Sequence, residues 1–227
     1  MSSLLGLLEQ DGFATIPGLL EPREVDSLTA ALSRTDLVRS RAGIRHAMKH
    51  PAVAAVAQDP RLREIAEFVL GRSAIPYRAT LFDKSSGSNW LVVWHQDTAL
   101  PLQNQEQCSG WGPWSTKDGI LYAHAPARAL SEVLALRLHL DDSAAENGPL
   151  RVLPATHTRG VLNDDEIHTL TEKISPIECT VPRGGVLAMR PLLVHASSKS
   201  QSKTPRRVLH IEYAARPVFD GLRLAVA

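Results

Sequence analysis

The chain has 227 residues, a length that suits one domain able to bury its own hydrophobic core. Its 25 Lys and Arg residues against 24 Asp and Glu residues give a net charge of +1. This balance excludes nucleic acid and an anionic membrane surface as expected partners, and no apolar run approaches the roughly 20 residues that cross a bilayer.

The cysteines and the start of the chain indicate the cellular compartment. Cys108 and Cys179 are the two cysteines, and they form no ligand-like pair. So few cysteines in a chain of this length are typical of a reducing cytoplasm. The apolar residues 1–9 lack a basic segment and a small-residue cleavage site, so they predict a helix and not a signal peptide. We therefore expect a cytoplasmic protein.

Helical signals dominate the first third of the chain. Residues 21–32 carry apolar side chains at helical spacing, with Pro22 in the first turn. A second clear helix begins after Asp59, a good N-cap residue, and Gly71 is placed to end it. One shorter helix is expected at about 164–173, capped by Asn163.

After Gly71 the pattern changes to short apolar runs separated by turn sequences such as Asn147-Gly148. The expected strands cover residues 75–83, 91–95, 120–124, 133–140, 150–153, 177–181, 186–189, 192–195 and 207–214. Residues 98–119 show no regular pattern, and a loop of that length in a compact domain is usually functional or disordered.

These elements predict a mainly β protein with flanking helices. The expected core is a double-stranded β-helix, a cupin-like jelly roll, with the N-terminal helices packed outside it. A flat α+β sandwich is the alternative. Since no repeat or linker divides the sequence, we expect one domain over residues 1–227.

The tripeptide His95-Gln96-Asp97 ends an apolar strand and is the first candidate for a metal site. Side chains alternate along a strand, so His95 and Asp97 point to one face. Two further His-x-acid pairs occur, His139 with Asp141 and His210 with Glu212. The former precedes a turn, and the latter lies late on the last strand. His95 opens a long polar loop, the usual place for a site on a scaffold, and is preferred.

A third ligand from a distant part of the chain would complete a facial triad and leave positions open for substrate and oxygen. His195 follows an apolar run and precedes a polar stretch, and Arg206 comes eleven residues later. A hairpin would put His195 and Arg206 on neighbouring strands of one sheet. The planar fork of arginine matches a carboxylate. Alternation sends Arg207 to the opposite face.

The four tryptophans gather near this motif. Trp90 and Trp94 alternate away from His95, so we expect them to pack in the core against the helices. Trp111 and Trp114 lie in the irregular stretch 98–119, where two large aromatic side chains argue for order. We expect a substrate lid there, and hydrophobic tethering of a long loop is the alternative.

Three basic side chains, Lys84, Arg137 and His210, are expected to face the barrel interior. Buried cations are rare unless they are paired. A carboxylate of a substrate or co-substrate would pair them, and the alternative is an internal salt bridge, for example with Glu212. His210 is therefore a candidate substrate contact.

Four segments resemble the phytanoyl-CoA dioxygenase family of Fe(II)- and 2-oxoglutarate-dependent oxygenases, over nearly the full chain. They are the opening Asp11-Gly-Phe-Ala-Thr-Ile-Pro-Gly-Leu-Leu20, the motif Trp94-His-Gln-Asp97, the central Asn147-Gly-Pro-Leu-Arg-Val-Leu-Pro-Ala-Thr-His157, and His195-Ala-Ser197 followed by Arg206. Two departures occur. Ala155 stands where the family usually has glycine, and the asparagine common after His-x-Ser is missing.

The resemblance implies a double-stranded β-helix, Fe(II) on His95, Asp97 and His195, and 2-oxoglutarate on Arg206. It also implies that Ser197 helps to hold the co-substrate. Thr80 and Lys84 match family contacts on the strand before the iron motif. Arg137, a further candidate co-substrate contact, occupies a position where relatives often place an aromatic pocket residue.

The expected activity is therefore the hydroxylation of a C–H bond in a small organic substrate, with O2 as oxidant and with 2-oxoglutarate converted to succinate and CO2. The alternatives are a metal-dependent hydrolase, in which zinc activates water, and a non-catalytic cupin-like binding module. The residues do not name the substrate, which in relatives is an acyl-CoA, an amino acid or a secondary metabolite, and they leave the oligomeric state open.

Overall fold

A computed structural model describes residues 2–33, 43–85 and 88–227. Its α-helices are α1 (Ser2–Gln10), α2 (Pro22–Ser33), α3 (Pro51–Ala57), α4 (Pro60–Leu70), α5 (Ala127–Leu130) and α6 (Asp164–Lys173). Its strands are β1 (Phe13–Ile16), β2 (Ile75–Lys84), β3 (Val92–His95), β4 (Ala99–Leu102), β5 (Trp114–Lys117), β6 (Ile120–His124), β7 (Val133–His139), β8 (Leu150–Val152), β9 (Ile177–Cys179), β10 (Val186–Met189), β11 (His195–Ser197), β12 (Arg206–Ala214), β13 (Val218–Phe219) and β14 (Leu222–Arg223).

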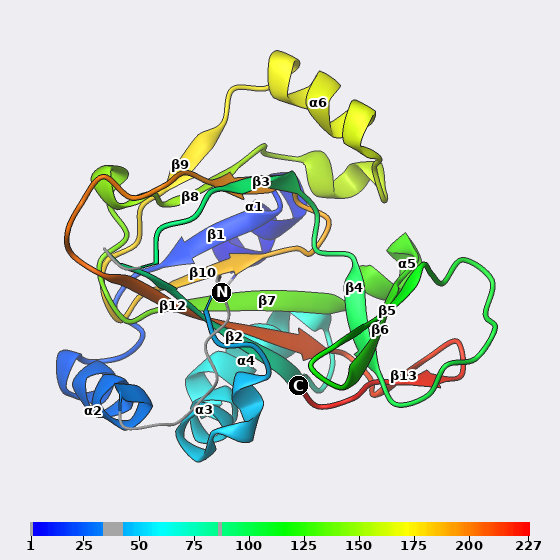
Figure 1. The fold of residues 1–227 in the computed structure, drawn as a ribbon, viewed down its shortest axis with the longest axis horizontal. Helices are drawn as coiled ribbons and strands as arrows, with labels where there is room; N and C mark the ends of the chain where they lie inside the picture. The colour runs from blue at the N-terminus through cyan, green and yellow to red at the C-terminus, as the bar shows by residue number, and fades with distance from the viewer. Residues whose placement is uncertain (1, 34–42, 86–87) are drawn as a thin grey trace.

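Two antiparallel sheets face each other and form a double-stranded β-helix, as the sequence predicts. The larger sheet has the strand order β1-β10-β7-β12-β2, and the smaller has the order β3-β11-β8-β9. A three-stranded sheet, β4-β6-β5, and the hairpin β13-β14 lie at one end of the barrel (Figure 1). The mainly β class with flanking helices is confirmed.

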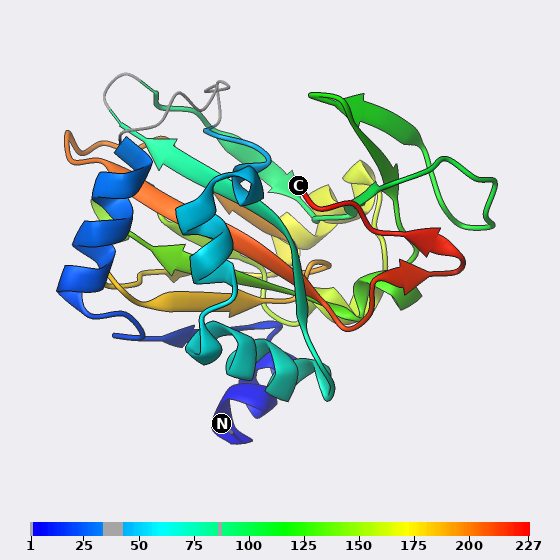
Figure 2. The same cartoon turned by 90° about the horizontal axis from the view of Figure 1, so that it is seen from below.

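The N-terminal helices cover the outer face of the larger sheet. Figure 2 shows α2, α3 and α4, in blue to teal, across that face. Their apolar side chains join those of β7 and β12 in one buried cluster, which includes Val25, Leu62, Leu136, Leu209 and Ile211. Because these outward residues alternate with inward ones, the residues between them on β7 and β12 point into the barrel.

Helix α6 covers the smaller sheet on the other side (Figure 1). It begins at the expected cap, where the Asn163 side chain accepts a hydrogen bond from the Glu166 backbone N–H at 2.9 Å. In return, the Glu166 side chain accepts a hydrogen bond from the Asn163 backbone N–H at 2.8 Å. This capping box satisfies backbone groups that the first turn leaves open. Ile167 and Leu170 pack under the helix with the partly buried Trp94.

Several elements differ from the expectation. Residues 13–16 lie in the predicted helical third but form strand β1, because Ala14 and Ile16 find β10 as a partner at the sheet edge. Residues 98–119 contain β4 and β5, which pair with β6 on either side. The strand expected at 192–195 starts at His195 and ends at Ser197. In each case long-range pairing decides the structure, and local pattern does not reveal it.

No helix in the described part of the chain is both long and apolar enough to cross a membrane.

Candidate active site

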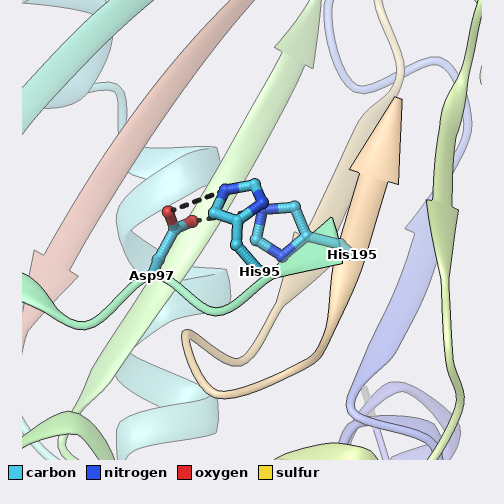
Figure 3. A group of neighbouring side chains, drawn as sticks. All are labelled: His95, Asp97 and His195. Atoms are coloured by element: carbon cyan, nitrogen blue, oxygen red, sulfur yellow. Dashed lines mark ion pairs between the residues drawn. The ribbon is translucent and has the colours of Figure 1, made fainter. Parts of the chain in front are cut away.

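His95, Asp97 and His195 converge inside the barrel. His95 ends β3 and His195 begins β11, and the two are direct partners across the smaller sheet. Asp97 follows β3, where its backbone N–H donates to the Pro191 carbonyl at 2.9 Å. Its carboxylate lies 3.8 Å from His95 Nε2 and 3.6 Å from His195 Nε2 (Figure 3). One ligating atom from each residue lies within 4.8 Å of the others.

Backbone carbonyls fix the tautomer of both imidazoles. His95 Nδ1 lies 2.8 Å from the Val93 carbonyl, and His195 Nδ1 lies 2.9 Å from the Leu193 carbonyl. A carbonyl can only accept, so each Nδ1 carries the proton and each Nε2 presents a lone pair. Both lone pairs are on the atoms nearest Asp97. This arrangement is the one that metal-binding histidines adopt.

The charges of the three side chains also suit a cation. Burial, aided by His95, lowers the pKa of His195 to about 4, so the ring is neutral at physiological pH. Burial opposes the ionisation of Asp97, but the facing imidazoles outweigh it and hold the pKa of that carboxyl below its usual range. Two neutral imidazoles and one carboxylate are the ligand set of a non-haem Fe(II) facial triad.

The other two His-x-acid pairs do not form such a cluster. His139 is buried in the barrel and neither of its ring nitrogens has a hydrogen-bond partner. Asp141 points away and binds Arg207 through two hydrogen bonds of 2.7 and 2.8 Å. Glu212 forms an ion pair with Arg78. Within residues 2–33, 43–85 and 88–227, the sole group of three possible ligands is His95, Asp97 and His195.

Gln96 lies between the two ligands of the motif and supports the site with its side chain, a role that the sequence pattern does not indicate. Its Nε2 donates to the carbonyls of Gly160 at 2.9 Å and Leu192 at 2.7 Å, and its Oε1 accepts from the Leu162 N–H at 2.8 Å. The buried amide therefore ties β3 to the turn that leads into His195. A side chain with all its hydrogen bonds made inside the protein fixes the backbone on either side of it.

We expect the Gln96→Ala variant to lose metal affinity by about 10- to 100-fold, the range seen when groups supporting metal ligands are removed. Competition against a coloured chelator measures the change. Gln103→Ala is the matched control, because that amide makes a single 3.2 Å bond to the Leu224 carbonyl, away from the triad. An unchanged metal affinity in Gln96→Ala would show that the turn keeps its position without this side chain.

A cavity opens beside the triad between the two sheets. Its empty volume, with the open mouth included, is about 570 Å³. The wall residues come from both sheets: Arg78, Thr80, Phe82, Lys84, Trp90, Val92, His95, Asp97, Arg137, Leu150, His195, Ser197, Arg206 and His210. Of the residues expected at the site, all but Trp111 and Trp114 line this cavity.

One end of the cavity is strongly basic. Ser197 Oγ accepts from Lys84 Nζ at 2.7 Å and from Arg206 Nη2 at 3.4 Å, and donates to the Gly148 carbonyl at 2.9 Å. Lys84 and Arg206 are both at most 2 % exposed. No carboxylate in the described part of the chain pairs with either cation. The Arg206 Nε has no hydrogen-bond partner, so this end could accept a carboxylate.

The expected hairpin between His195 and Arg206 is wrong in one respect. Arg206 lies on β12 of the larger sheet, opposite Lys84, whereas His195 and Ser197 lie on β11 of the smaller sheet. They meet across the cavity, not along a sheet. The expected direction of Arg207 is correct, because that side chain points outward to Asp141. The eight-residue connection 198–205 is long enough to change sheets, and the sequence pattern does not distinguish the two routes.

Arg137, His210 and Thr80 form the wall of the larger sheet. Arg137 and Thr80 lie opposite His210 on the two strands that flank β12. Arg137 Nη1 lies 3.0 Å from His210 Nδ1. Glu212, the partner considered for an internal salt bridge, pairs with Arg78 and also lies 3.9 Å from His210 Nε2, but it pairs with neither Lys84 nor Arg137.

Three of the four tryptophans are placed differently from the expectation, whereas Trp94 packs against α6 as expected. Trp111 is buried in the cluster beneath the three-stranded sheet, and its Nε1 donates to Asp220 at 2.9 Å. Trp114 on β5 packs against the same cluster. Neither lines the cavity, so their geometry fits tethering of the 98–119 segment. Trp90 lines the cavity 5.5 Å from Lys84 Nζ, where a helix-facing core position was expected.

Gly148, in the central segment 147–157, is required by the close approach of its turn to the end of β11. Its φ is +68°, and a Cβ there would lie 2.4 Å from the Ser198 carbonyl oxygen. Only glycine permits this approach of the Asn147-Gly148 turn to the end of β11. The turn thereby supplies the carbonyl that orients Ser197. The Asn-Gly pair is visible in the sequence, but its partner is not.

A protein-family model described as phytanoyl-CoA dioxygenase (PhyH) matches residues 8–208. L-proline trans-4-hydroxylase from Streptomyces griseoviridis is 26% identical over 180 residues, which cover 68% of this chain and 59% of that protein. Ectoine dioxygenase from Stutzerimonas stutzeri is 24% identical over 172 residues, covering 69% and 50%. The chain thus spans about half to three-fifths of the length of these curated relatives.

Solved structures share the fold. EctD from S. alaskensis with bound Fe superposes with a TM-score of 0.71 at 17% identity, covering 100% of this chain and 87% of that one. HygX from Streptomyces hygroscopicus, with nickel and 2-oxoglutarate bound, gives a TM-score of 0.70 at 19% identity, covering 97% and 89%. At these identities the likeness establishes the fold.

Proposed function

Because this chain belongs to the phytanoyl-CoA dioxygenase family, we propose that it is an Fe(II)- and 2-oxoglutarate-dependent dioxygenase that hydroxylates a C–H bond of a small organic molecule. The observation that carries the proposal is a pair of features in one cavity. A His-Asp-His cluster with both Nε2 lone pairs turned inward lies beside an unpaired Arg206–Lys84 end. The overall products are succinate, CO2 and the alcohol.

His95, Asp97 and His195 would hold the iron, with two nitrogen ligands and one oxygen ligand. When bound, the iron supplies the oxidising power of O2 at a site where the protein positions the substrate. The chain's own part is to fix the three ligands and to turn both Nε2 lone pairs toward the metal position. Gln96 and the two backbone carbonyls do the fixing.

The basic end would hold the remote carboxylate of 2-oxoglutarate. Arg206 offers a planar fork, and Lys84 and Ser197 add a second charge and a hydroxyl. The keto-acid end would then point along the cavity to the triad. Thr80 lies on β2, the strand next to the one that carries Arg206, and would flank the carbon chain of 2-oxoglutarate.

The two rival functions fit these contacts less well. A zinc hydrolase needs the triad and a water but gives no role to a buried Arg206–Lys84 pair without a carboxylate. A non-catalytic cupin-like module needs no vacant metal positions. The EctD structure with 2-oxoglutarate and 5-hydroxyectoine and the HygX structure show that this fold accommodates the co-substrate in other proteins.

We also propose that residues 1–227 act as one domain on a free small molecule. The N-terminal helices share a hydrophobic cluster with the larger sheet, so they support the wall that carries Arg206 and Thr80. Relatives are named for proline and ectoine, which are compact molecules, and a substrate of that kind would bind in the cavity beside the triad. The net charge of +1 provides no attraction for nucleic acid.

The test is O2-dependent release of succinate from 2-oxoglutarate by the purified chain with Fe(II). We expect slow succinate formation without a second compound and faster formation with a substrate. Zn(II)-loaded protein and anaerobic samples are the controls and should form none. Succinate formation at the rate of the anaerobic or Zn(II) controls would contradict the proposal.

The binding of 2-oxoglutarate should weaken as pH rises. Burial, with the charges of Arg206 and Arg137, lowers the pKa of Lys84 to about 7. An incoming carboxylate favours the protonated amine and raises that pKa, so binding takes up a proton above pH ~7. Calorimetry on the Ni(II)-loaded protein should give a Kd that is flat below this pH and rises above it. In the Lys84→Met variant the Kd should lose this rise, and an identical rise there would assign the proton to another group.

A further inference from the structure

Arg137 is a buried cation with no anionic partner among the residues that the structure describes. It lies on β7, and only 5 % of it is exposed. Its single hydrogen bond goes to His210 Nδ1 at 3.0 Å, its Nε has no partner, and its guanidinium lies 5.2 Å from the centre of the Phe82 ring. A neutral imidazole and an aromatic face stabilise a cation only weakly. The guanidinium is therefore available to bind an anionic ligand.

No carboxylate of the described residues can neutralise Arg137. Burial raises the pKa of Glu212 to about 7, and what charge Glu212 carries is used by its ion pair with Arg78. Asp97 belongs to the triad. Arg137 also keeps its proton, because burial lowers its pKa only to about 10. Lys84 differs, since its pKa of about 7 allows it to become neutral.

The co-substrate does not supply the missing charge. The proposed function uses one carboxylate of 2-oxoglutarate at the triad and the other at Arg206, and the molecule has no third. Fe(II) with Asp97 and one carboxylate is neutral, and Arg206 with the other carboxylate is neutral. The positive charge of Arg137 therefore remains without a counter-charge, whether or not Lys84 is protonated. A desolvated charge without a counter-charge is costly, so an anion is expected beside it.

The strand register puts Arg137 beside the triad and away from the Arg206 anchor. Arg137 lies opposite His210 on β12, and Arg206 lies four residues before His210, a rise of about 13 Å along the strand. The charge of Arg137 acts on Asp97 and His195 of the triad. A group bound by Arg137 would therefore sit close to the reacting centre, where the substrate must be.

We propose that Arg137 is the specificity-determining residue of this site and that the substrate carries an anionic group, a carboxylate or a group of similar shape, which Arg137 binds. The proposal rests on the proposed function and narrows its substrate class to small organic anions. It reassigns Arg137, which the sequence grouped with the co-substrate contacts. Acyl chains without a nearby charge, neutral sugars and amines without a carboxylate are excluded.

The first test separates Arg137 from the co-substrate. Calorimetry on Ni(II)-loaded protein gives the Kd of 2-oxoglutarate in Arg137→Gln and in Arg206→Gln. We expect the Arg206 variant to bind on the order of 30-fold more weakly or worse, and the Arg137 variant to stay within about threefold of wild type. Arg137→Gln removes an unpaired buried charge, so its melting temperature should not fall. Equal weakening in both variants would place both arginines on 2-oxoglutarate and overturn the proposal.

The second test uses the anionic group alone as its probe. Propionate, with propionamide as the neutral control, is titrated into protein loaded with Ni(II) and 2-oxoglutarate, and the melting temperature is followed. We expect a saturable rise with propionate only, its retention in Arg137→Lys, and its loss in Arg137→Gln. No rise with propionate, an equal rise with propionamide, or an equal rise in Arg137→Gln would each overturn the proposal. Succinate formation by the wild type without any second compound tests the proposed function separately.

Discussion

The Asp97→Ala variant is expected to lose more than about 100-fold in Fe(II) affinity and to form no succinate. Asp97 carries the one negative charge of the triad, and both imidazole Nε2 atoms lie within 3.8 Å of its carboxylate. Removing a direct ligand should exceed the 10- to 100-fold effects seen for groups that only support ligands. Competition with a coloured chelator measures the affinity, and succinate is quantified in the same samples.

Asp141→Asn is the matched control for this variant. Asp141 belongs to another His-x-acid pair, but its carboxylate faces Arg207 outside the cavity. We expect it to lower the melting temperature at most and to leave iron affinity unchanged. If Asp141→Asn lost iron and Asp97→Ala did not, the metal would bind at the pair of His139 and Asp141, and our assignment of the site would be wrong.

The Arg206→Ala variant should bind 2-oxoglutarate ~30- to ~4,000-fold more weakly while its iron affinity stays close to that of wild type. Losing one partner of a buried charge pair costs about 2–5 kcal/mol, partly because the other charge is stranded. Here the stranded charge is the remote carboxylate of the co-substrate. Because Lys84 and Ser197 stay in place, we expect the loss of 2-oxoglutarate affinity to stay below the upper end of this range. Calorimetry with Ni(II) in place of iron gives the affinity without turnover.

Arg207→Ala controls for loss of a neighbouring arginine. The Arg207 side chain makes two hydrogen bonds to Asp141 on the outer face, so its loss should leave 2-oxoglutarate binding within about twofold. A large loss in Arg207→Ala with little change in Arg206→Ala would mean that the inward and outward faces of β12 are exchanged.

Short motifs with strong local geometry were predictable from the sequence. Alternation along β3 is enough to put His95 and Asp97 on one face, and the same rule separates Arg206 from Arg207 on β12. The α6 cap at Asn163 and its end at residue 173 follow from capping chemistry and apolar spacing. These features depend on a few neighbouring residues, so one sequence contains the information.

Features that depend on distant partners were not predictable. The sheet to which β12 belongs is set by its pairing with β2 and β7. No residue near Arg206 in the sequence indicates which sheet this strand joins. Trp111 looked like a lid residue because its apolar partners and Asp220 come from other segments. Gln96 looked like a spacer, since its three hydrogen bonds go to backbone groups 64 to 96 residues away.

Mass analysis of succinate formed under 18O2 tests the central claim most directly. The account predicts that wild-type protein with Fe(II) and 2-oxoglutarate forms succinate that carries one 18O atom, because one atom of O2 enters the new carboxylate as CO2 is released. Asp97→Ala should form no labelled succinate. Unlabelled succinate from the wild type, or labelled succinate at an undiminished rate from Asp97→Ala, would contradict the assignment of this cavity as a dioxygenase site.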